Sequence, residues 1–253
     1  MNEKQTEPKN IAPGFLLINK PQGANSFRTI AQIRRIVGNK KLKAGYAGTL
    51  DPFATGLLVV AIGREATRML HALTRFDKKY IARAKLGEKT DTLDNTGQII
   101  ETCNAEIKEE KLFAAIKRLG KQYNQVPPIY CALKYNGVPL YKLARQKKKS
   151  ADVLHKAVQT KERTVLLHEL ILTDYSPPFF TVETHVSHGT YIRTLMDDIA
   201  RSAGSCATTH ELKRTAVGNI SLSDAVDLDE LKTIEDIENN LIEREIFRAN
   251  YLS

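Results

Sequence analysis

The segment GYAGTLDPFATG at residues 45–56 constrains this chain more than any other, because it places one carboxylate, Asp51, between glycines in a predicted loop. Pro52 biases Asp51 toward extended backbone and away from helix. Gly48 and Gly56 permit tight turns and close approach by a ligand. Taken alone, a single Asp in such a loop is most often a turn or N-cap residue. The rest of the chain decides whether Asp51 has more than this structural role.

Charge is unevenly distributed along the 253 residues, which suffice for one large domain or two small ones. The net charge is +9, yet the segment from Asp224 to the end carries nine acidic and only three basic residues. The remainder is therefore strongly basic, which favours a polyanionic partner, with RNA or DNA ahead of a membrane. The alternative is a basic protein whose charge serves only its solubility.

The cysteines and histidines indicate neither a metal site nor a disulfide framework. Cys103, Cys131 and Cys206 are scattered and odd in number, which suits a reducing cytosol. The six histidines are dispersed, so we expect no metal. The polar N-terminus does not resemble a signal peptide, and no apolar stretch approaches the ~18 residues of a membrane helix. The sequence thus predicts a cytoplasmic protein that does not associate with membranes.

Hydrophobic periodicity predicts alternating strands and helices along most of the chain. Ser26 is expected to cap one helix, which ends at Gly38, and residues 88–97 form a polar loop. Residues 150–162 are expected to be a flexible insertion, and the last 30 residues an acidic helical region. The expected strands lie at 14–19, 57–62, 79–86, 164–172 and 180–186, and the expected helices at 26–37, 65–76, 106–119, 139–149 and the residues after 190.

Two basic segments accompany the Asp51 loop. A cluster of arginines and lysines at residues 34–43 precedes it and is adjacent to the candidate site, which favours phosphate contact over a merely solvated face. The predicted helix at 139–149 interleaves basic residues with tyrosine, a pattern that suits nucleic-acid binding as well as it suits an exposed surface helix. Arg193, in the first turn of its helix, can pair locally with Asp197 at i+4.

Six ordered blocks of sequence stand out along the chain. They are FLLINKPQGANSF (15–27), KAGYAGTLDPFATGLLVVAIGREATR (43–68), KKYIARAKLGEKTDTLDNTG (78–97), QVPPIYCALKYNGVPLYKLAR (125–145), VSHGTYIRTLMDDIA (186–200) and ELKRTAVGNISLSDAVDLDEL (211–231). Together they resemble the TruB family of tRNA pseudouridine-55 synthases, in the order and spacing of that family. The resemblance covers about residues 14–231, nearly the whole chain.

The resemblance implies an α+β pseudouridine synthase fold, with a large mixed, mainly antiparallel sheet flanked by helices and a central catalytic cleft. Residues 1–13 are expected from their composition to be a disordered arm, and the resemblance implies a catalytic domain at 14–223 with an RNA-binding insertion at about 124–163. Residues 224–253 would then form a short acidic tail in place of the C-terminal RNA-binding module of many relatives. The implied reaction converts a uridine in the TΨC loop of tRNA to pseudouridine without cofactor, metal or obligatory protein partner, by a monomer.

The same resemblance assigns roles to individual residues. Asp51 matches the nucleophilic aspartate, Tyr80 the active-site tyrosine and Arg193 the arginine of the GTYIR motif. Tyr191 and Leu212 match positions that line the uridine pocket. The remaining residues expected to bind substrate are Tyr46, Lys20, Asp94, Lys134 and Arg145.

The implied chemistry explains these residue types. Pseudouridylation breaks an N-glycosidic bond and rejoins the base through carbon, and a carboxylate can add covalently to sugar or base. Because desolvation raises a carboxyl pKa and a guanidinium opposes that, the prediction is an Asp51–Arg193 ion pair rather than the local pair with Asp197. Tyr80 can stack on uracil and accept the C5 proton, directly or through water. The target base must leave its stack.

The chain departs from the family pattern at several positions. Tyr46 stands where the family usually has His, and Ala47 where it has Thr; Tyr46 can stack and donate one hydrogen bond but carries no charge near neutral pH. Asn25 replaces a common Thr and is expected to be a turn or cap residue. Residues 146–163 are longer and richer in lysine than usual.

Two alternatives stay open from sequence. One is a non-catalytic tRNA-binding or tRNA-folding protein on the same scaffold, which need not keep Asp51, Tyr80 and Arg193 together. The other is an RNA-guided pseudouridine synthase relative, which relies on a C-terminal module and protein partners. The close match to the stand-alone blocks disfavours the second alternative.

Overall fold

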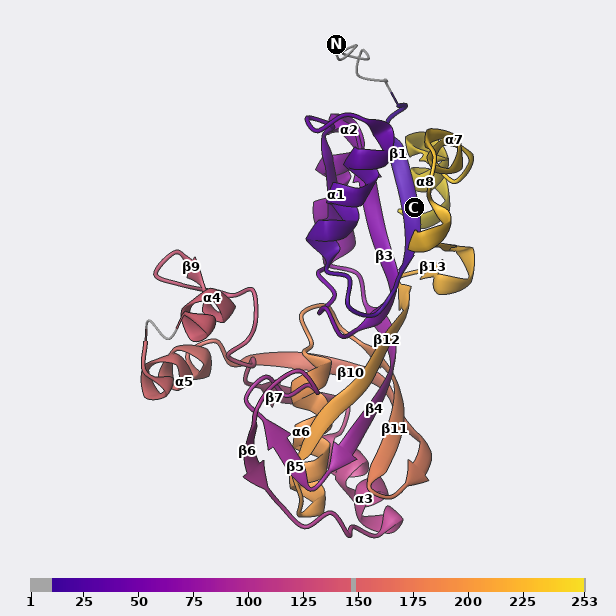
Figure 1. Ribbon diagram of the computed structural model, residues 1–253. Coiled ribbons are helices and arrows are strands. Elements are labelled where there is room, and N and C mark those ends of the chain that lie inside the picture. Colours follow the sequence, from indigo (N-terminus) through magenta and orange to yellow (C-terminus); the bar gives the residue numbers. More distant parts are fainter. Residues whose placement is uncertain (1–10, 147–148, 253) are drawn as a thin grey trace. The chain divides into compact units, whose positions relative to one another are not determined.

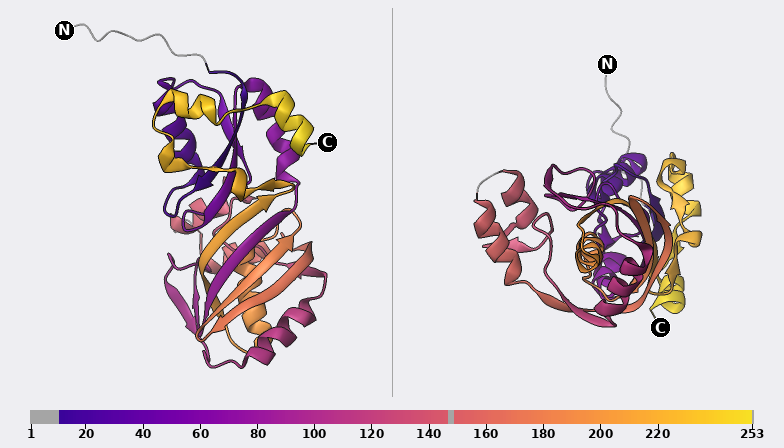
Figure 2. Two further views of the ribbon diagram at one scale, coloured as in Figure 1. Left: turned by 90° about the vertical axis from the view of Figure 1, so that its right-hand side faces the viewer. Right: turned by 90° about the horizontal axis from the view of Figure 1, so that it is seen from below.

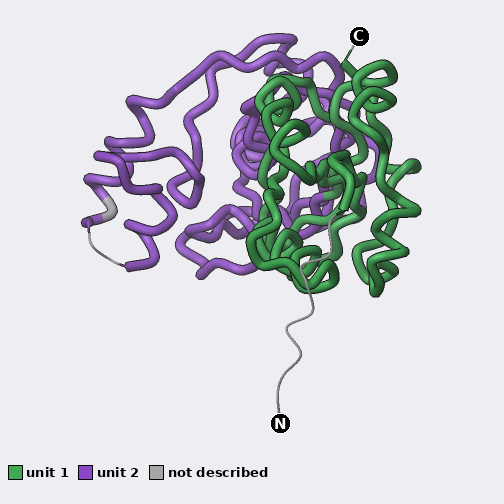
Figure 3. Tube along the Cα trace, turned by 90° about the horizontal axis from the view of Figure 1, so that it is seen from above, with its two compact units in different colours: residues 1–78, 213–253 green, residues 79–212 purple. Residues whose placement is uncertain are grey.

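The computed structural model describes residues 11–146 and 149–252, and the chain forms two compact units (Figures 1 and 3). Unit 1 contains the chain up to Lys78 and from Lys213 onward, and unit 2 contains Lys79–Leu212. Most of the arm expected at residues 1–13 lies outside the described residues, although Ile11 is described and buried. In the described part of the chain, no helix is both long enough and apolar enough to cross a bilayer.

Unit 1 is built on a buried antiparallel pair of strands, β1 (Gly14–Lys20) and β3 (Thr55–Ile62), which pair along the whole of β1. Side chains on both faces of these strands are buried, as expected of continuous apolar runs covered on two sides. Strand β2 (Ala44–Ala47) pairs antiparallel with β3, and helix α2 (Arg64–Thr74) packs against both. Helix α1 (Ser26–Val37) ends at Gly38 as predicted, but its N-cap is Asn25 rather than Ser26, because the Asn25 side chain accepts the Arg28 amide.

The last 30 residues also belong to unit 1 and are not simply helical. Two short strands pair with β1, one parallel and one antiparallel, so this segment extends the sheet. Phe247 stacks on Phe15 of β1 with ring centroids 3.8 Å apart. The elements are β13 (Ile220–Ser221), β14 (Val226–Asp227), α7 (Ile234–Asn239), β15 (Ile242–Glu243) and α8 (Arg244–Tyr251), with 3-10 turns at Leu222–Asp224 and Leu228–Glu230.

Unit 2 is a twisted sheet with two helices, α3 (Glu109–Leu119) and α6 (Ile192–Ala203), in contact with each other (Figures 1 and 2). The pairs of β10 with β7 and with β11 are antiparallel, and the α+β class with its mixed, mainly antiparallel sheet is confirmed. The expected loop at 88–97 contains a strand, β5 (Glu88–Thr90), paired with β6 (Ile99–Thr102). The sheet strands follow the order β12 (Ala207–Val217), β4 (Lys78–Leu86), β11 (Phe179–Val186), β10 (Arg163–Ser176) and β7 (Gln122–Gln125).

The 126–160 segment of unit 2 has a small core of its own, formed by residues such as Leu140, Leu143, Leu154 and Val158. A hairpin of β8 (Lys134–Tyr135) and β9 (Val138–Pro139) turns through Asn136 and Gly137, both at positive φ. The predicted helix at 139–149 ends early, as α4 (Leu140–Arg145), and the insertion expected to be flexible contains α5 (Ala151–Gln159). Lys147 and Lys148 lie outside the described residues.

The expectation of no disulfide is wrong for two of the three cysteines. Cys103 and Cys206 form a disulfide with an S–S distance of 2.06 Å, and Cys131 is a free, buried thiol. The two partners are 103 residues apart in sequence, and the fold brings them together at the ends of neighbouring elements of unit 2. Such a pair has no recognisable spacing, because only the tertiary fold juxtaposes it.

Candidate active site

The Asp51 loop of unit 1 is a tight turn between β2 and β3. The Ala54 amide donates to the Asp51 carbonyl at 3.1 Å, so Asp51 begins a turn, as the local reading of the sequence predicts. The Gly23 amide donates to the Pro52 carbonyl at 2.8 Å. The Ser26 hydroxyl accepts the Leu50 amide at 3.1 Å and lies 3.3 Å from the Leu50 carbonyl. The backbone on both sides of Asp51 is therefore fastened to the segment that follows β1.

Lys20, at the end of β1, anchors this loop from inside the protein. Its side chain is fully buried, and the ammonium donates to the carbonyls of Ala24 at 2.7 Å, Pro21 at 2.9 Å and Ala54 at 2.5 Å. Burial lowers the Lys20 pKa to about 8, an effect opposed by the Asp51 charge and reinforced by Arg214. The sequence predicts that Lys20 binds substrate, and the geometry shows that it holds the chain around Asp51.

Arg214 is the functional residue of this loop that the sequence analysis missed. Its guanidinium is buried and donates to the Leu57 carbonyl at 2.8 Å and to the Gly48 carbonyl at 3.0 Å, one on each side of Asp51. Gly56 has φ +100°, and a Cβ there would lie 2.3 Å from the Arg214 carbonyl oxygen. Gly56 thus allows the backbone of Arg214 to approach closely, and close approach by a ligand stays a prediction.

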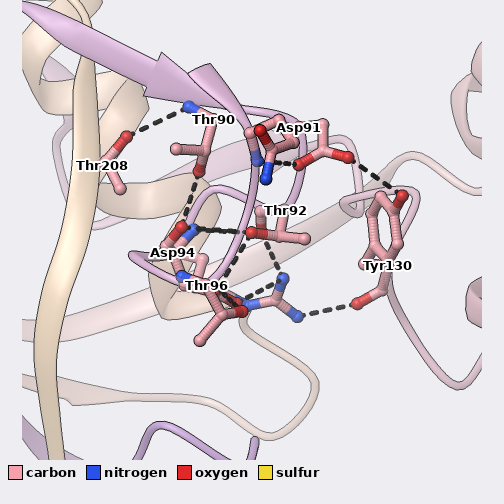
Figure 4. A network of polar contacts seen from close by, with 9 residues as sticks. Thr90, Asp91, Thr92, Asp94, Thr96, Tyr130 and Thr208 are labelled. Carbon is pink, nitrogen blue, oxygen red and sulfur yellow. Dashed lines mark hydrogen bonds and ion pairs between the residues drawn. The ribbon is translucent and has the colours of Figure 1, made fainter. Parts of the chain in front are cut away.

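Arg193 of unit 2 forms a second buried polar centre (Figure 4). Its guanidinium donates to the carbonyls of Thr92 and, at 2.8 Å, Tyr130, and lies 3.6 Å from the Asp94 carboxylate. Asp197, the local partner that its spacing offered, instead pairs with Lys89 at 2.8 Å. Arg193 therefore joins the loop after β5 to the start of the 126–160 segment.

Asp94 organises the loop after β5. One carboxylate oxygen accepts the Thr92 hydroxyl at 2.9 Å, the Thr96 amide at 3.0 Å and the Thr96 hydroxyl at 2.5 Å (Figure 4). The other oxygen faces Arg193, and only 6% of Asp94 is exposed. We infer from these contacts that Asp94 fixes the position of Arg193 in addition to any contact with substrate.

Tyr191, the N-cap of α6, is held by a buried glutamine and a stacked arginine. Gln125 donates to the Tyr191 carbonyl at 3.0 Å and accepts its amide at 2.8 Å. The Arg163 guanidinium lies 4.8 Å from the centre of the Tyr191 ring, within cation–π range. Burial raises the Tyr191 pKa to about 12, so the phenol stays neutral and can donate a hydrogen bond under physiological conditions.

The other predicted site residues occupy different surroundings. Tyr80 on β4 and Tyr46 on β2 are half-buried, and Leu212 on β12 is buried. Lys134 and Arg145 are exposed on the 126–160 segment, and their binding to RNA stays a prediction. Asp51, Lys20 and Tyr46 belong to unit 1, and the other seven predicted residues to unit 2. The Asp51–Arg193 ion pair joins residues of different units and stays a prediction.

The mixed, mainly antiparallel sheet of unit 2 and the anchored Asp51 loop of unit 1 are typical of a pseudouridine synthase. Solved structures support this fold. A chain of the archaeal box H/ACA sRNP Nop10–Cbf5 complex matches with a TM-score of 0.61 at 25% identity, over 90% of this chain and 57% of that chain. A chain of an H/ACA RNP bound to a substrate RNA containing 2'-deoxyuridine matches with a TM-score of 0.63 at 23% identity, over 93% and 58%.

Sequence comparison identifies the family. The N-terminal domain of TruB family pseudouridylate synthases matches residues 34–192, more than half of the chain. Similar proteins include tRNA pseudouridine synthase B of Haemophilus influenzae, 38% identical over 87% of this chain and 67% of its own length, and that of Syntrophotalea carbinolica, 41% identical over 87% and 68%. The protein therefore belongs to the TruB family of pseudouridylate synthases, and it spans about two thirds of the length of these relatives.

Proposed function

We propose that this protein isomerises the uridine at position 55 in the TΨC loop of tRNA to pseudouridine, with Asp51 as nucleophile acting on a flipped-out base. The observation that carries the proposal is the Asp51 loop, which Lys20, Ser26 and Arg214 fasten from three sides. A catalytic group has to be held within about 0.5 Å of its working position by packing and hydrogen bonds, and these three anchors provide such support for Asp51. The proposed substrate, tRNA, is inferred from similar proteins that are named tRNA pseudouridine synthase B.

The proposed reaction uses each group for one task. The bond between N1 of uracil and C1' of ribose breaks, and C5 of the turned base bonds to C1'. The C5 proton leaves and N1 gains one, so that the net reaction is an isomerisation. Asp51 forms the covalent intermediate, Arg193 keeps the carboxylate ionised, and Tyr80 stacks on the base and accepts the C5 proton directly or through water.

RNA binding is proposed to rest on backbone shape and charge. Lys134 and Arg145 contact phosphates of the T arm, while Tyr46, Tyr191 and Leu212 surround the everted uridine. The protein acts on bare tRNA as a monomer in the cytoplasm, without guide RNA.

The test is pseudouridine mapping on unmodified tRNA transcript with purified wild-type protein, Asp51→Asn and the matched control Asp229→Asn, an exposed aspartate of unit 1. We expect product at position 55 from the wild type and the control and none from Asp51→Asn, which still binds tRNA. Turnover by Asp51→Asn would remove Asp51 as nucleophile. Binding without turnover by the wild type would favour a tRNA-folding protein, and a requirement for added guide RNA would favour the RNA-guided class.

A further inference from the structure

A cavity of about 630 Å³ lies within unit 2, and the proposed reaction does not use it. Its volume is in the range of about 300–1,000 Å³ typical of small-molecule sites. Apolar residues of the 126–160 segment form one wall, among them Pro127, Ile129 and Leu154. Other lining residues come from α6 and the segment from β5 to β6, and they include Asp91, Asp197 and Asp198 besides Lys89. We call this space the acidic cavity.

The part of the acidic cavity that α6 lines consists of residues at i, i+3 and i+4, namely Thr194, Asp197 and Asp198. Asp197 is satisfied, because it pairs with Lys89 and accepts the Ala207 amide at 3.1 Å. Among the described residues, none donates a hydrogen bond to the Asp198 carboxyl. The Thr194 side chain is 92% buried, and its hydroxyl has no hydrogen-bond partner there either. The Thr194 hydroxyl is therefore unsatisfied within the described protein, whereas the Asp198 carboxyl is partly exposed and makes no hydrogen bond to it.

An unsatisfied buried hydroxyl such as that of Thr194 is costly in a protein interior, and the partly exposed Asp198 carboxyl beside it is accessible to a ligand that donates hydrogen bonds. Burial and the charge of Asp197 raise the Asp198 pKa to about 7. A ligand that donates hydrogen bonds to Asp198 would stabilise its ionised form. The apolar wall requires in addition a ligand with flat or aliphatic faces, and Tyr130 adds an aromatic ring to the lining.

A nucleobase has the required combination of apolar faces and a polar edge, and the bases differ in what they offer a carboxylate. Guanine presents two adjacent donors, N1–H and N2–H, with the geometry that matches the two oxygens of one carboxylate. Adenine and cytosine place a ring acceptor beside the amino group, and uracil flanks its one N–H with two carbonyls. Each of these three would bring a lone pair against the Asp198 oxygens.

We propose that the acidic cavity binds a guanine base, with the Asp198 carboxylate accepting N1–H and N2–H, the Thr194 hydroxyl as a further polar contact and the apolar wall stacking on the ring. The inference deepens the proposed function, because an unpaired guanine of the substrate RNA would dock the 126–160 segment onto α6. The same chemistry would accept a free guanine nucleotide.

The first experiment uses the wild-type protein and five mononucleotides, GMP, IMP, AMP, CMP and UMP, with binding measured by calorimetry or NMR. We expect GMP to bind, IMP to bind about tenfold more weakly because it lacks the 2-amino group, and the others more weakly still. Asp198→Asn should lose about tenfold in GMP affinity, whereas Asp152→Asn, on the exposed face of α5, should not. Equal affinities for GMP and AMP, or an unchanged Asp198→Asn, would overturn the proposal.

The second experiment finds the source of the guanine and separates the two proposals. T-arm RNAs in which single unpaired guanines are replaced by inosine are assayed for binding to wild type and Asp198→Asn. One position whose replacement weakens binding to the wild type only would identify an RNA guanine. No such position, with GMP still bound through Asp198, would identify a free nucleotide. Pseudouridine formation without any guanine selectivity would leave the proposed function standing and remove this site.

Discussion

At the scale of single residues, Asp51 is held by side chains whose own charges are buried. Lys20 and Arg214 each place a cation among carbonyl oxygens of the loop, so their positive ends are solvated by protein instead of water. The loop around Asp51 is therefore held by two buried cations, and the Asp51 charge in turn opposes the lowering of the Lys20 pKa.

The lowered pKa of Lys20 predicts a pH dependence of stability. The folded-state pKa is about 8 against 10.5 in the unfolded chain, so between these values the unfolded chain binds more protons and stability rises with pH. Urea unfolding at pH 8 and pH 9.5 should show a gain in stability to which Lys20 contributes on the order of 1 kcal/mol, while Lys78, whose pKa is also lowered to about 8, contributes the rest. Lys20→Met should therefore show a smaller gain than the wild type, and the exposed control Lys79→Met should keep the full gain. The same slope in wild type and Lys20→Met would contradict the assignment.

The sequence was enough to predict the turn at Asp51, because glycine and proline act locally, while the catalytic role of Asp51 stays a prediction. It was not enough to identify Arg214, since a buried arginine and a surface arginine look alike in a basic chain. Arg193 illustrates the same limit, because its i+4 neighbour Asp197 pairs with Lys89, a residue from a distant strand. Local spacing ranks possible partners, and the fold selects among them.

At the scale of elements, the C-terminal segment is part of the unit 1 core. Helix α8 buries Phe247 completely, and strands β15 and β14 pair with the two ends of β1, at Gly14 and Phe15 and at Ile18 and Asn19. Acidic composition predicted helix there, but two-residue strands give no periodic signal. Long apolar runs such as β1 and β3 were predicted correctly, because a strand that is buried on both faces is apolar at nearly every position.

Phe247→Ala should destabilise the protein by about 3–5 kcal/mol, because it removes a fully buried ring stacked on Phe15. Ile246→Ala, one residue earlier and 51% exposed, is the matched control and should change stability by less than about 0.5 kcal/mol. Denaturant unfolding measures both. If Phe247→Ala were as stable as the wild type, like Ile246→Ala, the C-terminal helix would be a peripheral tail, as the sequence suggested.

At the scale of the whole molecule, segments that are far apart in the sequence come together in each unit, both in the distribution of charge and through the disulfide. Unit 1 combines the basic region before Asp51 with the acidic C-terminal segment, which come from opposite ends of the chain. Unit 2 is closed on itself by the Cys103–Cys206 disulfide, which encloses most of its residues. Neither feature can be predicted without knowing which distant segments meet.

The disulfide predicts that stability depends on redox conditions. A cross-link that closes a loop of about 100 residues raises the free energy of unfolding by up to about 4–5 kcal/mol, because it lowers the conformational entropy of the unfolded chain. Dithiothreitol should therefore lower the melting temperature of the oxidised wild type to that of Cys103→Ser, and leave Cys103→Ser itself unchanged. Hydrogen exchange should locate the lost protection in residues 103–206. If mass spectrometry shows the bond reduced while the melting temperature is unchanged, native packing alone holds these segments together and the cross-link contributes nothing to stability.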